Sequence, residues 1–222
     1  MTARDPNVGI VCTHVWQSLS PVMHNAAYRE MGVNLRYGIF EVPELLSEDV
    51  RKEFFDAFLR MQSEIGIVGM SVTMPFKEDI TTSIEVRAMS KSATEIGAAN
   101  TLSNLVSGRW YADNTDWVGV VESIEEAGVA IDGKTALVIG AGGTARAVAY
   151  GLGKRKAHQV IVANRTEANA VSLASDLQPV LDRTHVNPYG LEHIFPRVDE
   201  GGINLAKNAD IVFNTTLIGQ DG

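Results

Sequence analysis

Cysteine is almost absent from this chain of 222 residues, since Cys12 is its only one. A single cysteine excludes an internal disulfide framework and favours a reducing compartment, so we expect a cytoplasmic protein. The chain also lacks any apolar run that approaches the roughly 18 residues of a membrane-spanning helix. Its first residues contain no apolar signal-peptide region. The sequence therefore predicts a protein with no membrane partner.

Positive charge is in short supply, with 19 Lys and Arg against 27 Asp and Glu and a net charge of −8. This balance argues against nucleic acid as a partner, because a basic surface is what binds phosphate backbones. An anionic substrate would need donors placed close to it, because the overall field repels it. The five histidines show no zinc-ligand spacing, so we expect no metal site.

The composition, with 45% apolar and 21% charged residues, is typical of a globular protein with a core. Segments with strand character alternate with segments of helical character, which predicts the α/β class. The pattern changes near residue 113. We therefore expect a first domain over residues 1–113 and a second over residues 114–222.

Capping residues divide the first part into short elements. Ser20 followed by Pro21 indicates a helix start, with the serine as N-cap. Ser47 caps a second expected helix. The expected elements are strands over residues 8–11, 37–40 and 65–73, helices over 20–31, 47–61 and 84–96, and a hairpin of residues 101–105 with 109–111 around Ser107-Gly108.

The second part repeats a strand, turn and helix pattern. An amphipathic helix connects it to the first part, and residues 180–208 show no clear pattern. The expected elements are helices over residues 116–127, 144–152 and 166–177, and strands over 135–139, 159–163 and 211–213.

A glycine-rich turn lies between the predicted strand 135–139 and the next helix, and it fits G-x-G-x-x-G/A. Gly140 makes the tight turn, Gly142 lets the backbone approach a pyrophosphate, and Ala145 lets the helix pack closely on the strand. The helix N-terminus offers N–H groups to the phosphates. A tight turn without a ligand is the alternative. The predicted dinucleotide site comprises Gly140, Ala141, Gly142, Gly143, Thr144 and Ala145.

The following strand ends in Asn164-Arg165-Thr166, where an NAD site usually has a carboxylate for the ribose 2′-hydroxyl. No carboxylate is present, and Arg165 can pair with a 2′-phosphate. Thr166 can cap the next helix and donate to the same phosphate. The segment favours NADP over NAD, unless Arg165 is only a solvated charge at a helix start.

Two other segments bring polar groups to predicted strand ends. Lys77 follows a predicted strand and opens the next expected helix, and a lysine there can donate or accept a proton. Ser18 and Ser20 place two hydroxyls beside a helix start, which suits a carboxylate. The ordinary alternatives are a solvated lysine and a simple N-cap serine.

Six motifs, taken in order, resemble those of the shikimate dehydrogenase family, and a final Asn-Thr-Thr at 214–216 is similar to the family's segment near the nicotinamide. Each motif alone is modest, but the set covers essentially the whole chain and is highly specific. The motifs are S-x-S-P-x-x-H-N at 18–25, V-T-x-P-x-K at 72–77, G-A-x-N-T at 97–101, N-T-D-x-x-G at 114–119, G-A-G-G at 140–143 and N-R-T at 164–166.

The resemblance implies an N-terminal α/β substrate-binding domain followed by a Rossmann-type NADP-binding domain with a doubly wound parallel sheet. It implies that Lys77 is the catalytic acid/base, paired with Asp116, and that Ser18 and Ser20 hold the substrate carboxylate. It further implies that Thr73, Asn100 and Asp116 bind ring hydroxyls, and that NADP is bound by Gly140, Ala141, Gly142, Gly143, Thr144, Ala145, Asn164, Arg165, Thr166, Thr215 and Thr216.

The implied activity is NADP-dependent shikimate dehydrogenase, which reduces 3-dehydroshikimate to shikimate reversibly in aromatic amino acid biosynthesis. We expect a monomer or homodimer with this small-molecule substrate. A quinate or dual quinate/shikimate dehydrogenase is one alternative, and a non-catalytic sensor of a shikimate-like ligand is another. A folate-type methylene dehydrogenase shares the two-domain plan but does not fit the serine pair.

Several positions depart from the family pattern. Gln17 and Ser71 replace a usual His and Asn, and Asn169 lies where a second basic residue often follows. Family members also continue past Gly222, with further strands and a glutamine-bearing helix that returns to the first domain. We therefore expect that the family's C-terminal end, and with it part of the nicotinamide pocket, is missing here.

Overall fold

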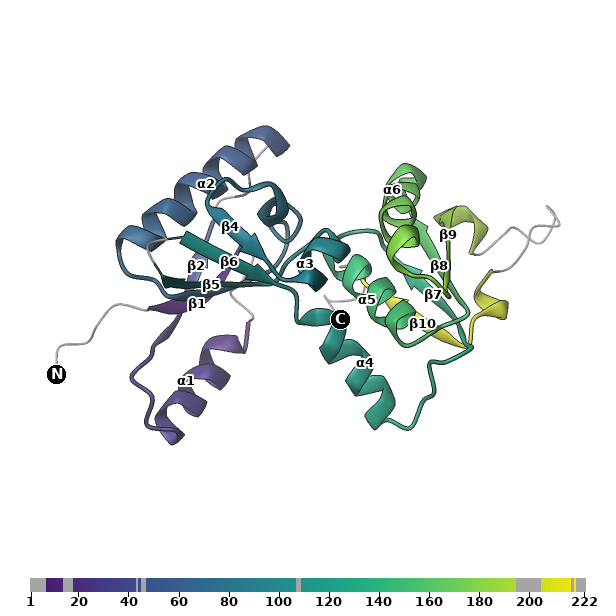
Figure 1. Ribbon diagram of the computed structural model, residues 1–222, viewed down its shortest axis with the longest axis horizontal. Helices are drawn as coiled ribbons and strands as arrows, with labels where there is room; N and C mark the ends of the chain where they lie inside the picture. The colour runs from purple at the N-terminus through teal and green to yellow at the C-terminus, as the bar shows by residue number, and fades with distance from the viewer. Residues whose placement is uncertain are drawn as a thin grey trace. The chain divides into compact units, whose positions relative to one another are not determined.

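The computed structural model describes residues 7–13, 18–42, 44, 47–106, 109–194, 205–216 and 218 (Figure 1). The chain forms two compact units. Unit 1 comprises Met1–Thr94 with Ala98–Asn114, and unit 2 comprises Glu95–Gly97 with Thr115–Gly222. Each combines a sheet with helices, so the predicted α/β class is confirmed. Gln17 and the expected Ser107-Gly108 turn lie outside the described residues.

Unit 1 is built on a mixed six-stranded sheet in the order β2-β1-β3-β5-β6-β4. Strand β1 runs parallel to β2 and β3, β5 runs antiparallel to β3 and β6, and β4 is parallel to β6. The antiparallel pair β5 and β6 is the expected hairpin. The strands are β1 (Val8–Cys12), β2 (Tyr37–Glu41), β3 (Gly69–Val72), β4 (Val86–Met89), β5 (Thr101–Val106) and β6 (Arg109–Asp113).

Helices cover the two faces of this sheet unequally (Figure 1). Helix α2 (Glu48–Glu64) buries Phe55, Phe58 and Leu59 in the main core of the unit. The opposite face carries Val8, Ile10 and Tyr37, next to α1 (Ser20–Glu30), which buries none of its residues completely. A 3-10 turn η1 (Asp79–Thr82) and the short helix α3 (Lys91–Ile96) complete the elements. Most of the apolar burial in unit 1 is therefore on the α2 face.

Several predictions about unit 1 are wrong. Residues 65–68 are not strand, because Ile65 caps the end of α2 and Gly66 turns the chain at φ 88° before β3 begins. The expected helix over 84–96 is β4 followed by α3, because pairing with β6 decides the conformation of residues whose local pattern is ambiguous. The N-cap of α1 is Leu19 rather than Ser20, which is the first helical residue.

Unit 2 carries a wholly parallel sheet in the order β10-β7-β8-β9. The order places β8 and β9 on one side of β7 and β10 on the other, so the switch point of a doubly wound sheet lies between β7 and β10. The elements are α4 (Asp116–Glu126), β7 (Thr135–Ile139), α5 (Gly143–Lys154), β8 (Gln159–Asn164), α6 (Glu167–Leu177), β9 (His185–Gly190) and β10 (Ile211–Asn214), with 3-10 turns η2 (Gln178–Val180), η3 (Leu191–His193) and η4 (Leu205–Asn208).

Strand β9 lies in the segment that showed no pattern in the sequence. Among the described strands it pairs with β8 alone and forms one edge of the sheet. Pro188 sits within it, and an edge strand tolerates a proline because one row of its backbone groups has no ladder partner. The same proline is a signal against strand structure in the sequence, which is why the strand was not expected.

Residues Glu95–Gly97 belong to unit 2 because their polar groups bind α5. The Glu95 carboxylate accepts a hydrogen bond from the Tyr150 hydroxyl at 2.6 Å and pairs with the Lys154 ammonium at 3.1 Å. Burial raises the pKa of the Tyr150 hydroxyl, and the neighbouring Glu95 carboxylate raises it further. The Arg146 guanidinium donates to the Ile96 carbonyl. In the part of the chain that is described, no helix is both long and apolar enough to cross a bilayer.

Helix α5 ends in a left-handed turn at Lys156, whose φ is 62°. The Ala157 N–H bonds the Leu152 carbonyl and the Lys156 N–H bonds the Gly153 carbonyl, which is a Schellman motif. Glycine is the usual residue at this position, because a side chain with Cβ is strained there.

We predict that Lys156→Gly raises the free energy of unfolding by about 0.5–1 kcal/mol, because relief of strain outweighs the added freedom of the unfolded chain. Urea denaturation followed by circular dichroism measures it. Lys156→Ala is the control, since it keeps Cβ and should stay close to the parent protein. Equal stabilities for the glycine and alanine variants would contradict the assignment of strain.

Candidate active site

Three backbone hydrogen bonds join separate segments at one end of the sheet in unit 1. The Val72 N–H donates to the Asn100 carbonyl at 2.7 Å, and the Ala99 N–H donates to the Lys77 carbonyl at 2.8 Å. The Asn100 N–H donates in turn to the Asp113 carbonyl at 3.0 Å. These bonds bring the predicted residues Thr73, Lys77 and Asn100 together in unit 1.

The prediction that Lys77 opens a helix is wrong. Lys77 lies in a turn, and the next helical element, η1, begins only at Asp79. The turn includes a cis peptide bond between Met74 and Pro75, and the Phe76 N–H donates to the Thr73 carbonyl. Phe76 itself is completely buried, whereas the side chain of Lys77 is only partly buried. The backbone of this turn is therefore anchored in the core next to a lysine that is partly exposed.

The two predicted serines lie at the start of α1. The Ser20 N–H donates to the Ser18 hydroxyl at 3.3 Å, so the two residues are in contact. The N-cap residue Leu19 provides no side-chain cap, so Ser20 does not have the simple capping role that was its ordinary alternative, while the Ser18 hydroxyl accepts one N–H at the helix start. Both side chains are partly exposed, as a binding role requires.

The N-T-D segment divides into structural and candidate functional residues. Asn114 is 2% exposed, and its side-chain N–H donates to the Ala98 carbonyl at 2.8 Å. The Asp113 carboxylate accepts bonds from the Ser92 hydroxyl and the Asn114 N–H. Asp116 begins α4 in unit 2 and is partly exposed. The predicted pairing of Asp116 with Lys77 stays a prediction.

The glycine turn of unit 2 lies at the switch point of its sheet. Gly140 has φ 113°, and an added Cβ would lie 2.5 Å from the Thr215 hydroxyl. That hydroxyl donates to the Ile139 carbonyl at 2.7 Å, while the Asn214 side chain accepts from the Thr216 N–H. The predicted Gly140 and Thr215 are thus adjacent, and only glycine fits at the first position.

Helix α5 begins at Gly143 directly after this turn, with Gly142 as N-cap and no side-chain cap. The first N–H groups of a helix have no intrahelical acceptor, so this uncapped end suits a phosphate. Ala145 is fully buried, which agrees with close packing of the helix on the sheet. Ala141 and Thr144 are partly exposed beside it.

The predicted 2′-phosphate residues follow the end of β8. The Asn164 side chain donates to the Thr166 carbonyl at 2.9 Å, whereas Arg165 and Thr166 are exposed. Thr166 occupies the N-cap position of α6, but its hydroxyl does not cap the helix. Arg165 is therefore exposed to solvent at the carboxyl ends of the strands, the same end of the sheet as the glycine turn. Across the described residues, no three His, Cys, Asp or Glu side chains gather to hold a metal ion.

Comparison with known proteins gives two family matches. Residues 10–102 match the family described as shikimate dehydrogenase substrate binding domain, and residues 122–199 match shikimate/quinate 5-dehydrogenase. The NADP-dependent shikimate dehydrogenase of Symbiobacterium thermophilum is 35% identical over an alignment that covers 99% of this chain and 70% of that protein. This chain belongs to the shikimate dehydrogenase family.

Solved structures agree with this family assignment. A shikimate dehydrogenase crystallised with NADP+ matches with a TM-score of 0.75 and 33% identity, over 96% of this chain and 67% of that one. The Thermus thermophilus shikimate 5-dehydrogenase, crystallised with NADP(H) and shikimate, matches with a TM-score of 0.72 and 29% identity, over 96% and 69%. The predicted resemblance and fold are confirmed.

Sequence reasoning missed Tyr37, the first residue of β2. It is 5% exposed. Within the described structure, no group meets the distance and angle criteria for a hydrogen bond with its buried hydroxyl. Burial raises the pKa of Tyr37, while the neighbouring hydroxyls of Ser71 and Ser20 act in the opposite direction. The hydroxyl therefore lies beside Ser20, one of the two serines assigned to the substrate carboxylate.

The His-Asn end of the family's first motif explains how Tyr37 is held. The Asn25 side chain donates to the Tyr37 carbonyl and accepts from the Tyr37 N–H, both at 2.9 Å. The His24 ring stacks on the tyrosine ring with centroids 4.3 Å apart. A tyrosine in a strand looks like an ordinary core residue in the sequence, so no sequence signal separates Tyr37 from the core.

We predict that Gly140→Ala lowers the free energy of unfolding by about 2–3 kcal/mol, because the new methyl group collides with Thr215 in a left-handed backbone conformation. Thermal or urea unfolding measures the change. Gly119→Ala is the matched control, since an added Cβ meets nothing within 4 Å in α4 and should stabilise the helix by up to about 1 kcal/mol. Equal effects of the two substitutions would refute the close contact.

Proposed function

We propose that this chain is an NADP-dependent shikimate dehydrogenase, which interconverts 3-dehydroshikimate and shikimate. The observation that carries the proposal is the backbone network that gathers Thr73, Lys77 and Asn100 at one sheet edge of unit 1. Relatives that are 35% and 38% identical to this chain, over 99% and 95% of its length, are named shikimate dehydrogenase (NADP+). Because the cysteine-poor composition suits a reducing environment, we assign the reaction to the cytosol.

Lys77 is the acid/base in this proposal. Reduction of a ring ketone places negative charge on its oxygen, and a nearby ammonium group can supply the proton. In the reverse direction the neutral amine accepts the proton from the hydroxyl. Thr73 and Asn100 orient the neighbouring ring hydroxyls, and Asp116 is assigned as the acidic partner of Lys77 from the family motif.

The carboxylate of the substrate is assigned to the start of α1. Ser18 and Ser20 contribute hydroxyl donors close to the helix N-terminus. Tyr37 places a third hydroxyl beside Ser20, although this hydroxyl is itself buried. Such local donors are what an anionic substrate needs on a chain with a net charge of −8.

The residues of unit 2 fit NADP. Gly140, Ala141, Gly142, Gly143, Thr144 and Ala145 form the phosphate turn, Thr215 and Thr216 flank it, and Asn164, Arg165 and Thr166 are assigned to the 2′-phosphate. Support comes from the uncapped N-terminus of α5 and from the tight turn at Gly140, where only glycine fits against Thr215. When bound, the reduced cofactor supplies the hydride. Arg165 can bind the 2′-phosphate, because no carboxylate stands at the end of β8 to repel it.

We predict that Lys77→Ala lowers kcat for shikimate oxidation by about 10²-fold or more with little change in shikimate affinity, because acid/base assistance is lost. Absorbance of the reduced nicotinamide at several shikimate concentrations measures it, with quinate as a second substrate. Lys91→Ala, at an exposed position of α3, is the control. Weaker binding with turnover intact would assign Lys77 to binding alone.

We predict that Arg165→Ala raises the KM for NADP by about 10–100-fold and leaves the KM for NAD nearly unchanged, because only NADP carries the 2′-phosphate. The same absorbance assay with each cofactor measures both values. Arg183→Ala is the matched control. Arg183 is an exposed arginine that precedes β9, so it lies at the amino ends of the parallel strands, opposite to Arg165. A parallel loss for both cofactors would show that Arg165 does not contact that phosphate.

A further inference from the structure

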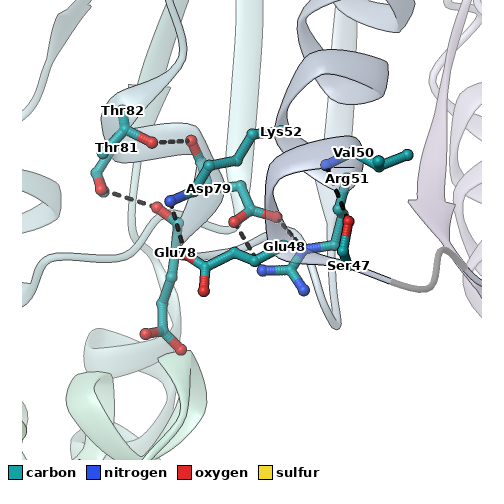
Figure 2. A network of polar contacts seen from close by, with 9 residues as sticks. All are labelled: Ser47, Glu48, Val50, Arg51, Lys52, Glu78, Asp79, Thr81 and Thr82. Atoms are coloured by element: carbon teal, nitrogen blue, oxygen red, sulfur yellow. Dashed lines mark hydrogen bonds and ion pairs between the residues drawn. The ribbon is translucent and has the colours of Figure 1, made fainter.

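Helix α2 holds the chain just after Lys77 through an ion pair between a partly exposed arginine and a buried carboxylate. Arg51 Nε lies 2.6 Å from Asp79 Oδ2, and Arg51 Nη2 lies 3.0 Å from Asp79 Oδ1, so the guanidinium binds both carboxylate oxygens (Figure 2). Asp79 is 4% exposed, although it is charged and lies in a turn. This bidentate geometry fixes both the distance and the orientation of the two groups.

The same helix also holds the residue just before Lys77. The ring of Phe55 stacks on that of Phe76, with centroids 4.9 Å apart and planes 9° from parallel. Both rings are buried in the core of unit 1. Lys77 is therefore placed between a residue anchored by packing and a segment anchored by charge, and both anchors come from α2.

The backbone around Asp79 is held as well as its side chain. The Thr82 hydroxyl donates to the Asp79 carbonyl at 3.2 Å, and the Thr81 hydroxyl donates to the Glu78 carbonyl at 2.8 Å (Figure 2). The carbonyl of Lys77 accepts the Ala99 N–H. The turn from Phe76 to Thr82 thus has few ways to change its conformation without breaking one of these contacts.

A buried ion pair is poor evidence of stability by itself, because desolvation of both charges offsets their attraction. Its better-supported use is to select one conformation among several. A proton donor must in turn be held within hydrogen-bond reach of its acceptor, and small displacements of a catalytic group greatly reduce the rate.

We propose that Arg51 and Asp79 are positioning residues that fix the turn carrying Lys77, so that its amine is held in the productive place. This inference rests on the proposed function of Lys77. Neither residue is assigned contact with substrate or cofactor. The pair acts through the backbone, by holding η1 against α2.

The test compares Asp79→Asn and Arg51→Lys with the parent protein. We expect each to lower kcat for shikimate oxidation about tenfold or more and to leave the KM for NADP within about twofold, because only the placement of Lys77 changes. Arg51→Lys keeps the positive charge but loses the planar guanidinium that binds both carboxylate oxygens. If Arg51 acted only through its charge, this variant would retain the parent's activity. It also decides the question if Asp79→Asn does not fold.

Glu85→Gln is the matched control, because Glu85 pairs with Arg60 of the same helix at 2.8 Å, further along the same segment. This pair is more exposed, with 58% of the Arg60 side chain accessible. We expect its loss to change kcat by less than about twofold. An equal fall in kcat for Glu85→Gln would show that any link between α2 and this segment matters, and would overturn the specific role of Arg51 and Asp79.

A second readout separates this inference from the proposed function. The rate at which trinitrobenzenesulfonate modifies Lys77, measured by peptide mass spectrometry, should rise about threefold or more in Asp79→Asn and Arg51→Lys, because a loosened turn exposes the amine. If the parent protein does not oxidise shikimate, the proposed function fails, and the modification rates still test the positioning. Unchanged modification rates in folded variants would overturn the inference.

Discussion

The arrangement of the candidate site depends on the need of buried backbone groups for hydrogen-bond partners. At one edge of the sheet in unit 1, the N–H groups of Val72, Ala99 and Asn100 find carbonyl partners in segments far away in the sequence. These bonds fix the backbone positions from which the polar side chains extend. The family motifs for Thr73, Lys77 and Asn100 lie on these same segments, so fold and chemistry share one set of interactions.

Unit 2 applies a steric constraint where unit 1 applies hydrogen bonds. The backbone at Gly140 passes so close to the Thr215 hydroxyl that no side chain fits between them. This contact lies just past the carboxyl ends of β7 and β10, at the switch point where doubly wound sheets bind ligands. The glycine pattern closes the turn against β10, and in the proposed function the uncapped start of α5 beside it takes the phosphates of NADP.

The elements of unit 2 from α4 to α6 could be predicted because local pattern and tertiary pairing agree there. Strands β4 and β9 could not, because the first depends on pairing with β6 and the second contains Pro188 at a sheet edge. Among candidate site residues, the motifs identified Lys77, Ser20 and Gly140 directly. Tyr37 and the Arg51–Asp79 pair emerge only once strands and helices are packed, since no spacing in the sequence joins residues 51 and 79.

The central claim is that unit 1 gathers the groups that recognise shikimate at the edge formed by the ends of β3 and β6 and the start of α1. An NMR titration of the ¹⁵N-labelled protein with shikimate tests this claim most directly. The account predicts that amide shifts concentrate at residues 18–20, 73–77 and 99–101. Shifts confined to other parts of the chain, or no saturable shifts at these amides, would contradict it.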